Sequence, residues 1–152
     1  MNDAEYEAQK ARVLAVFAEW SQRLALSHWD FYYTWHRQNP KDHGEGVIMS
    51  VGPEWQYLHA NVQVYLEETA KRDDEFLRRD VVHELAHCLL APACEGHKIP
   101  SHLVEFTASS LTRLILVLTN AEEGVGKIEL LHPDGTRLAD KGTEAAVKQG
   151  DA

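Results

Sequence analysis

Cysteine is scarce in this chain, which has only Cys88 and Cys94 among its 152 residues. Two cysteines do not make the disulfide framework of a small secreted protein. No segment approaches the roughly 20 consecutive apolar residues of a membrane span. Residues 1–13 are charged and lack the apolar core of a secretory signal. We therefore expect a cytoplasmic protein in a reducing compartment, with no membrane partner.

Positive charge is also scarce. The chain has 15 Lys and Arg against 24 Asp and Glu, a formal net charge of −9. Nucleic-acid binding usually needs a basic face, so we expect no nucleic-acid partner. One basic cluster, Lys71-Arg72 with Arg78-Arg79, is interrupted by acidic residues, and we interpret it as a solvated helix face.

The composition, 44% apolar and 26% charged, is typical of a globular protein. We predict a single α+β domain over 1–140 and a loose tail over 141–152. Near-alternation of apolar and polar residues predicts three strands in a small mixed sheet, at 29–35, 47–51 and 59–66. We expect Gly52-Pro53 to stop the second strand and the third to be half exposed.

Three segments carry the helical period. Apolar residues recur at three- and four-residue steps in 4–26, which predicts an N-terminal helix. A second long helix is expected to begin at Asp73 or Asp74, as a capping residue, and to end at about Leu90 or Ala91, since Pro92 follows. Its expected core side consists of Phe76, Leu77, Val81, Val82, Leu85 and Leu89.

A last helix is expected from Ser101, as its N-cap, to about Thr119. It is nearly apolar in its second half, but we judge it too short and too interrupted for a membrane span. We therefore expect the central buried helix of the domain. Beyond it, a turn signal predicts a hairpin over 128–138.

The second long helix carries His83-Glu84-Leu85-Ala86-His87, the pattern H-E-x-x-H. Residues four apart on a helix lie on one face, about 5–6 Å apart at Cβ, so both imidazoles can reach one Zn²⁺ ion. Glu84 then lies beside the metal, where its carboxylate can take a proton from the zinc-bound water. We interpret Cys88 as a small buried side chain.

A catalytic zinc site usually has three protein ligands and one open position. The longer pattern with a third histidine fails, because Leu90 and Ala93 occupy its glycine and histidine positions. Glu105 is the favoured third ligand, since a carboxylate on so apolar a helix needs a partner. The alternative is a solvent-facing Glu105 at the helix start. Glu95 and His97, in the intervening loop, are less favoured ligands.

With these residues, the chain resembles the zincin-like metallopeptidases of the gluzincin kind in a minimal form, and the small metallopeptidases of phages and prophages. The resemblance covers roughly residues 55–118. It implies that His83, His87 and Glu105 bind zinc and that Glu84 activates water.

The resemblance also implies that an edge strand aligns the substrate backbone as an added strand, which we assign to 59–66. One departure is Ser109, which stands where the family often has an acidic residue supporting the site. The family's oxyanion-stabilising residue has no clear counterpart; the candidates are His59, Tyr57, His102 and Arg113.

Zinc-dependent hydrolysis of a peptide or protein substrate is the leading hypothesis, carried out by a metallopeptidase or metalloendopeptidase. The alternative is a zinc-stabilised module of the same fold that binds a protein partner with little or no catalysis. Within the enzyme class, an anti-repressor or stress-response metalloprotease is a further hypothesis. The charge of −9 and the glutamate ligand disfavour a DNA-associated protease of the SprT-like kind.

Overall fold

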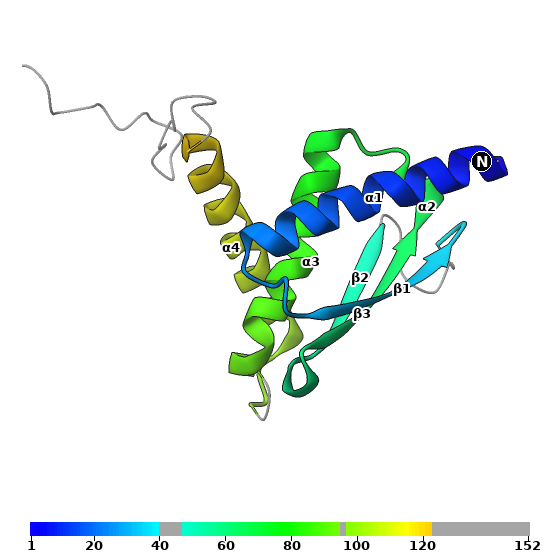
Figure 1. The fold of residues 1–152 in the computed structure, drawn as a ribbon. Helices are drawn as coiled ribbons and strands as arrows, with labels where there is room; N and C mark the ends of the chain where they lie inside the picture. The colour runs from blue at the N-terminus through cyan, green and yellow to red at the C-terminus, as the bar shows by residue number, and fades with distance from the viewer. Residues whose placement is uncertain (40–46, 95–96, 123–152) are drawn as a thin grey trace, which may run out of the picture. The chain divides into compact units, whose positions relative to one another are not determined.

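The computed structural model describes residues 1–39, 47–94 and 97–122 (Figure 1). The chain divides into two compact units, Met1–Leu116 and Val117–Ala152. The first unit contains the sheet, three helices and most of the fourth. The hairpin predicted over 128–138 and the predicted boundary between 140 and 141 lie outside the described residues.

A three-stranded mixed sheet confirms the predicted α+β class. Its strands are β1 (Asp30–His36), β2 (Met49–Glu54) and β3 (His59–Tyr65), in the order β1-β3-β2. β3 pairs in parallel with β1 and antiparallel with β2. Both sides of β3 are therefore occupied, and the expectation that 59–66 accepts an added substrate strand is wrong. The edge strands are β1 and β2.

β2 continues through Gly52-Pro53, so the expectation that this pair stops the strand is wrong. The reason is the place of β2 at the edge of the sheet. Proline lacks the N–H that a central strand must donate, but an edge strand can turn that position away from its single neighbour. A short 3₁₀ turn, η2 (Trp55–Tyr57), then leads into β3.

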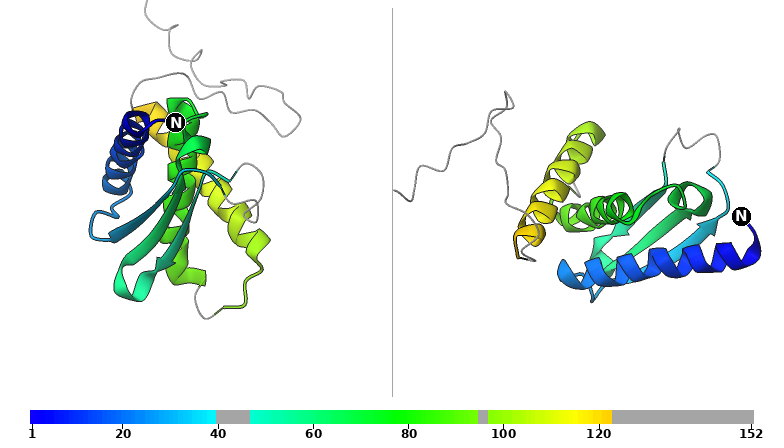
Figure 2. Two further views of the ribbon diagram at one scale, coloured as in Figure 1. Left: turned by 90° about the vertical axis from the view of Figure 1, so that its right-hand side faces the viewer. Right: turned by 90° about the horizontal axis from the view of Figure 1, so that it is seen from above.

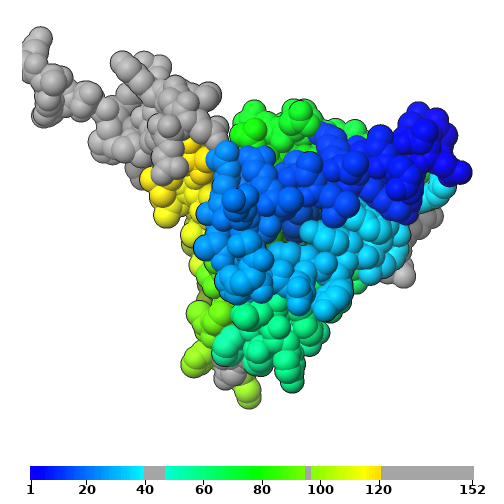
Figure 3. Space-filling model, viewed as in Figure 1, coloured from blue at the N-terminus to red at the C-terminus, as the bar shows by residue number. Residues whose placement is uncertain are grey.

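Helix α1 (Asp3–Arg23) confirms the N-terminal prediction and begins with a capping box between Asn2 and Glu5. It buries an apolar stripe consisting of Val13, Phe17 and Trp20. The Phe17 ring meets the edge of Tyr33 on β1, with ring centroids 5.5 Å apart. The space-filling view shows α1 lying directly against β1 (Figure 3).

After the short helix α2 (Leu66–Thr69), α3 (Asp74–Cys94) carries the H-E-x-x-H pattern. Asp73 caps it as predicted, since its carboxylate accepts the Phe76 N–H at 2.8 Å. The end predicted at Leu90 or Ala91 is wrong, because Pro92 lies inside the last turn. So close to the terminus, a proline removes few helical hydrogen bonds.

The predicted core side of α3 is confirmed at Leu77, Val81, Val82 and Leu85, which are fully buried. It is wrong at Phe76 and Leu89, which are 44% and 38% exposed. The buried residues pack with Ala60, Val62 and Val64 of β3 in one core. α1 and α3 lie on the same face of the sheet, α1 along β1 and α3 along β2, so this unit has two layers (Figure 2).

Helix α4 (Ser101–Glu122) begins within one residue of the predicted start, but Ser101 is its first helical residue and not its cap, because the Pro100 carbonyl accepts a hydrogen bond from the Val104 N–H. It is not a central buried helix. Leu103, Phe106 and Leu114 are 48%, 71% and 55% exposed. By length and composition alone, Ser101–Asn120 could cross a membrane, with mean hydropathy 1.2 and 11% of it buried. The expectation that it is too short and interrupted for a span is thus wrong on those two criteria.

Candidate metal centre

His83 and His87 lie on the face of α3 that points away from the core. The helix period separates a buried stripe, which includes Leu85, from a polar stripe containing Asp80, Glu84 and the two histidines. The two imidazole Nε2 atoms are 3.3 Å apart, and their side chains are 24% and 15% exposed. The predicted pair is therefore brought together, half buried and open on one side.

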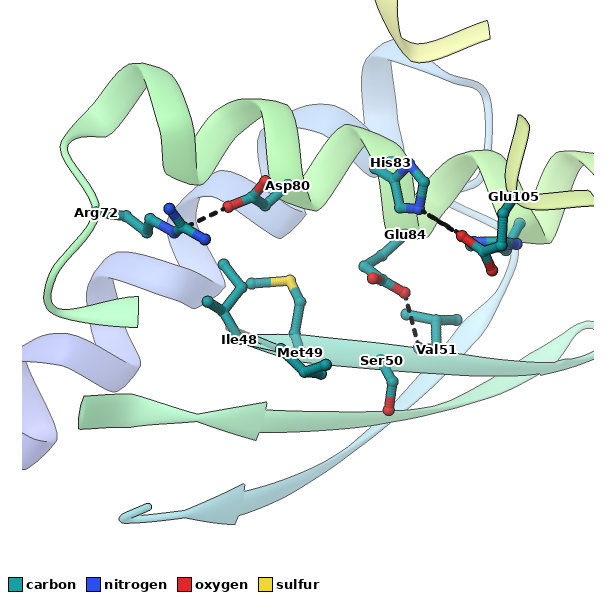
Figure 4. Close-up of a pocket in the computed structure, with 11 residues that line it drawn as sticks. Ile48, Met49, Ser50, Val51, Arg72, Asp80, His83, Glu84 and Glu105 are labelled. Atoms are coloured by element: carbon teal, nitrogen blue, oxygen red, sulfur yellow. Dashed lines mark hydrogen bonds and ion pairs between the residues drawn. The ribbon is translucent and has the colours of Figure 1, made fainter. Parts of the chain in front are cut away.

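Glu105 reaches this pair from the second turn of α4 (Figure 4). One carboxylate oxygen lies 3.3 Å from His83 Nε2 and the other lies 3.5 Å from His87 Nε2. The Glu105 side chain is 60% exposed. The argument from burial on an apolar helix was therefore wrong, although the residue chosen is the one that meets the histidines. Glu105 faces solvent near the start of the helix, which was the alternative to a buried third ligand.

These three side chains have the spacing of a zinc site, and they form a group that could hold a metal ion. Two ligand atoms that each lie about 2.0–2.1 Å from a tetrahedral zinc ion are about 3.3–3.4 Å apart. The distances of 3.3, 3.3 and 3.5 Å agree with that geometry. Two imidazoles and a carboxylate also suit zinc chemically, and three ligands leave a fourth position for water.

Burial lowers the pKa of His87, although the Glu105 carboxylate acts in the opposite direction, and the neighbouring His83 lowers it further. A lowered pKa keeps the imidazole neutral at physiological pH, with a nitrogen lone pair available. Neutral imidazole is the form that binds metals. Cys88, next in the chain, is buried as predicted, and burial raises the pKa of its thiol to about 12. A thiol of that pKa is a poor metal ligand, because only the thiolate binds.

Glu84 lies beside the three ligands but contacts the sheet instead. Its Oε2 accepts a 2.9 Å hydrogen bond from the Val51 N–H of β2. Burial raises the pKa of Glu84 to about 8, although the Val51 N–H acts in the opposite direction. The negative charges of Glu105 and Asp80 raise the pKa further. A carboxyl group whose pKa is close to neutral is suited to accept and release a proton.

Two cavities adjoin the three ligands along β2. One, of about 500 Å³, contains the histidines, Glu84, Glu105 and the first half of β2, and it ends at Arg72 and Asp80. The other, of about 460 Å³, shares Val51 and His87 with the first and is lined by Trp55 and Leu90. Together they form a groove between α3 and the edge strand, polar at one end and largely apolar at the other.

The remaining predicted site residues lie elsewhere. Tyr57 and His59 stack on each other with ring centroids 5.7 Å apart, and His59 lies 3.2 Å from Glu54. His102 is exposed in the first turn of α4, and Ser109 lies one turn after Glu105. None of these four lines either cavity, nor does Arg113. Glu95 lies outside the described residues, and His97 is an exposed residue after α3.

Several residues of the groove were missed, among them Val51, Arg72 and Asp80. Arg72 was interpreted as part of a solvated face, yet it lines the cavity together with Asp80. Asp80 lies four positions before Glu84, so helix periodicity alone could have placed it on the site face. Nothing in the sequence places Arg72 there, because its position depends on the turn before α3.

No protein-family model, curated protein or solved structure matches this chain.

Proposed function

We propose that this chain is a zinc-dependent peptidase with a zincin-like site. His83, His87 and Glu105 hold the ion, and Glu84 is the general base. One observation supports this most strongly. Three donor groups meet at tetrahedral spacing, while Glu84, on the same helix, turns away from them and is held by the edge strand. A purely structural site has no use for such a carboxylate.

A bound zinc ion would polarise the scissile carbonyl and lower the pKa of water. The protein supplies the proton transfer. Val51 holds Oε2 of Glu84, which leaves Oε1 to accept a proton from the attacking water. Glu84 then passes that proton to the leaving amine. Positioned acid–base groups of this kind contribute about 10²–10⁴-fold in rate.

The peptide would lie along β2 rather than along 59–66. Ile48 accepts a hydrogen bond from the Tyr65 N–H, whereas the Val51 N–H bonds to Glu84. Because N–H and C=O groups alternate in direction along a strand, Met49 and Val51 turn theirs away from β3. No strand among the described residues pairs with that side of β2. Its Met49 N–H and its outward carbonyls are therefore available to an added peptide strand. The Val51 N–H is held by Glu84, and Pro53 has no N–H.

Zinc removal and restoration test the proposal. The full chain is stripped with a chelator and then mixed with a peptide library, with and without one equivalent of Zn²⁺. We expect cleavage by the zinc-loaded protein and none by the stripped protein, detected by mass spectrometry. Equal cleavage in both samples would point to a contaminating protease and contradict the proposal.

A zinc-stabilised binding module is the second candidate, and one observation favours it. The residues that line the two cavities include no tyrosine or lysine, and no histidine besides the His83–His87 pair, that could stabilise an oxyanion. Thermal melting distinguishes the two functions. A melting temperature that rises with Zn²⁺, with every library peptide left intact, would establish the binding module.

A further inference from the structure

The end of the groove away from Trp55 carries an arginine that the proposed catalysis does not use. Arg72 lies 3.3 Å from Asp80 through its Nε atom (Figure 4). The two groups form an ion pair, but they are not aligned for a hydrogen bond, since Asp80 Oδ2 is buried and has no hydrogen-bond partner among the described residues. Among the described residues, neither Nη group of Arg72 donates a hydrogen bond.

Besides the two histidines, Arg72 is the one basic side chain among the described residues that line this cavity. Asp80 is shared between two arginines, because its other oxygen lies 3.6 Å from Arg79. Only Arg72 of the two lines the cavity, with its side chain 34% exposed. A partly exposed guanidinium whose Nη groups donate no hydrogen bond is suited to bind a carboxylate through two N–H groups.

The spacing places Arg72 about two peptide residues from the reacting carbonyl. Asp80 precedes the midpoint of His83 and His87, beside which the zinc ion would lie, by five residues, which corresponds to about 7.5 Å along a helix. An extended peptide advances about 3.3 Å per residue, so two residues span about 6.6 Å. Arg72 thus lies beside the second residue away from the scissile bond.

The direction of the chain decides which side of the bond this is. β2 and α3 run the same way along the groove, from Met49 and Asp80 at one end to Trp55 and Leu90 at the other. A strand added antiparallel to β2 directs its C-terminal half toward Arg72. Glu84 agrees with this direction. It lies on the Asp80 side of His87, and it must reach the amine of the C-terminal product.

We propose that Arg72 selects substrates with a carboxylate at the second residue after the scissile bond. This inference rests on the proposed function. The carboxylate belongs either to an Asp or Glu side chain or to the C-terminus of a peptide that ends there. In both cases, the two Nη groups bind its oxygens while Asp80 holds Nε.

A peptide library tests the proposal with the zinc-loaded full chain. It contains matched Glu and Gln at the second position after the bond, with free and amidated C-termini. We expect about tenfold faster cleavage with a carboxylate at that position. Arg72→Gln should abolish the preference, Arg72→Glu should invert it toward Lys and Arg, and Arg72→Lys should keep part of it. Arg79→Gln is the control, because Arg79 contacts Asp80 without lining the cavity.

Binding separates this proposal from the proposed function. The same peptides are captured on zinc-loaded Glu84→Gln protein, with and without Arg72→Gln. Cleavage without a carboxylate preference, or with a preference for Lys or Arg, would overturn the role of Arg72 alone. If carboxylate peptides are captured only when Arg72 is present, and no peptide is cleaved by the zinc-loaded wild type, the peptidase proposal would be overturned. Carboxylate recognition by Arg72 would then stand. Neither cleavage nor selective capture would overturn both.

Discussion

The Val51 N–H of β2 donates a 2.9 Å hydrogen bond to the Glu84 carboxylate of α3. This bond joins the edge strand of the sheet to the helix that carries both histidines. It fixes one carboxylate oxygen and turns Glu84 out of the ligand cluster. The position of the proposed base therefore depends on a contact between residues 33 positions apart in the chain.

Loss of that contact should change the titration of Glu84. Val51→Pro removes the donor, and an edge strand that already contains Pro53 should accept a second proline. Because the Val51 N–H lowers the pKa of Glu84, we expect the pKa in the metal-free protein to rise above about 8. NMR titration of the Glu84 carboxyl carbon measures it, with Val51→Ala as the control. An unchanged or lower pKa in the proline variant would show that the hydrogen bond has no influence.

The metal-free protein should lose stability as the pH rises from 6.5 to 8. The unfolded chain releases the Glu84 proton near 4.5, whereas the folded protein retains it to about 8. The folded state therefore binds more protons across that interval, and its free energy of unfolding falls with pH. His87, whose pKa is lowered, acts in the opposite direction but only below about 6.5.

Glu84→Gln isolates this effect, because glutamine has no proton to release. Between pH 6.5 and pH 8, the wild type should lose about 2 kcal/mol of its free energy of unfolding through Glu84, since one proton corresponds to about 1.4 kcal/mol per pH unit. The variant should not show this loss. Urea unfolding of both metal-free proteins provides the measurement. Parallel stability curves for the two proteins would refute the raised pKa.

Zinc binding should need all three ligands. His83→Ala, His87→Ala and Glu105→Ala should each weaken binding by more than a hundredfold, since even loss of a supporting partner costs about 10–100-fold. Atomic absorption after dialysis measures the zinc retained. His102→Ala is the matched control for Glu105, because it lies on the same helix outside the cavities. Full zinc content in any of the three variants would remove that residue from the site.

Two leucines one turn apart on α3 test the packing beneath the site. Leu85 is fully buried, whereas Leu89 is 38% exposed. Leu85→Ala should reduce the free energy of unfolding by about 2–5 kcal/mol, because it leaves a cavity in the core. Leu89→Ala should cost less than about 1 kcal/mol. Denaturant unfolding of the metal-free variants measures both, and equal losses would contradict the orientation of the helix.

The features predicted correctly from the sequence are mostly local. The spacing of His83 and His87 follows from helix geometry, and the cap at Asp73 follows from its side chain. The strand segments were found, but their order was not, because pairing joins residues far apart in the sequence. The added-strand site was consequently assigned to β3 instead of β2.

Burial of α4 was predicted incorrectly for a related reason. Apolar composition indicates that a helix can be buried, but not that a partner exists to cover Leu103 and Phe106. Glu105 does meet the two histidines, but the prediction relied on a buried carboxylate, and the side chain is 60% exposed. Arg72 could not be chosen, since only the folded turn before α3 brings it to Asp80.

The hydrolysis rate of zinc-loaded Glu84→Gln, at zinc content equal to the wild type, tests the central proposal most directly. Glu84 is absent from the ligand cluster, so the variant should keep its metal. It should lose at least about a hundredfold in kcat, because glutamine cannot accept the proton. A variant that holds the same zinc and cleaves peptides as fast as the wild type would contradict the assignment of Glu84 as the base.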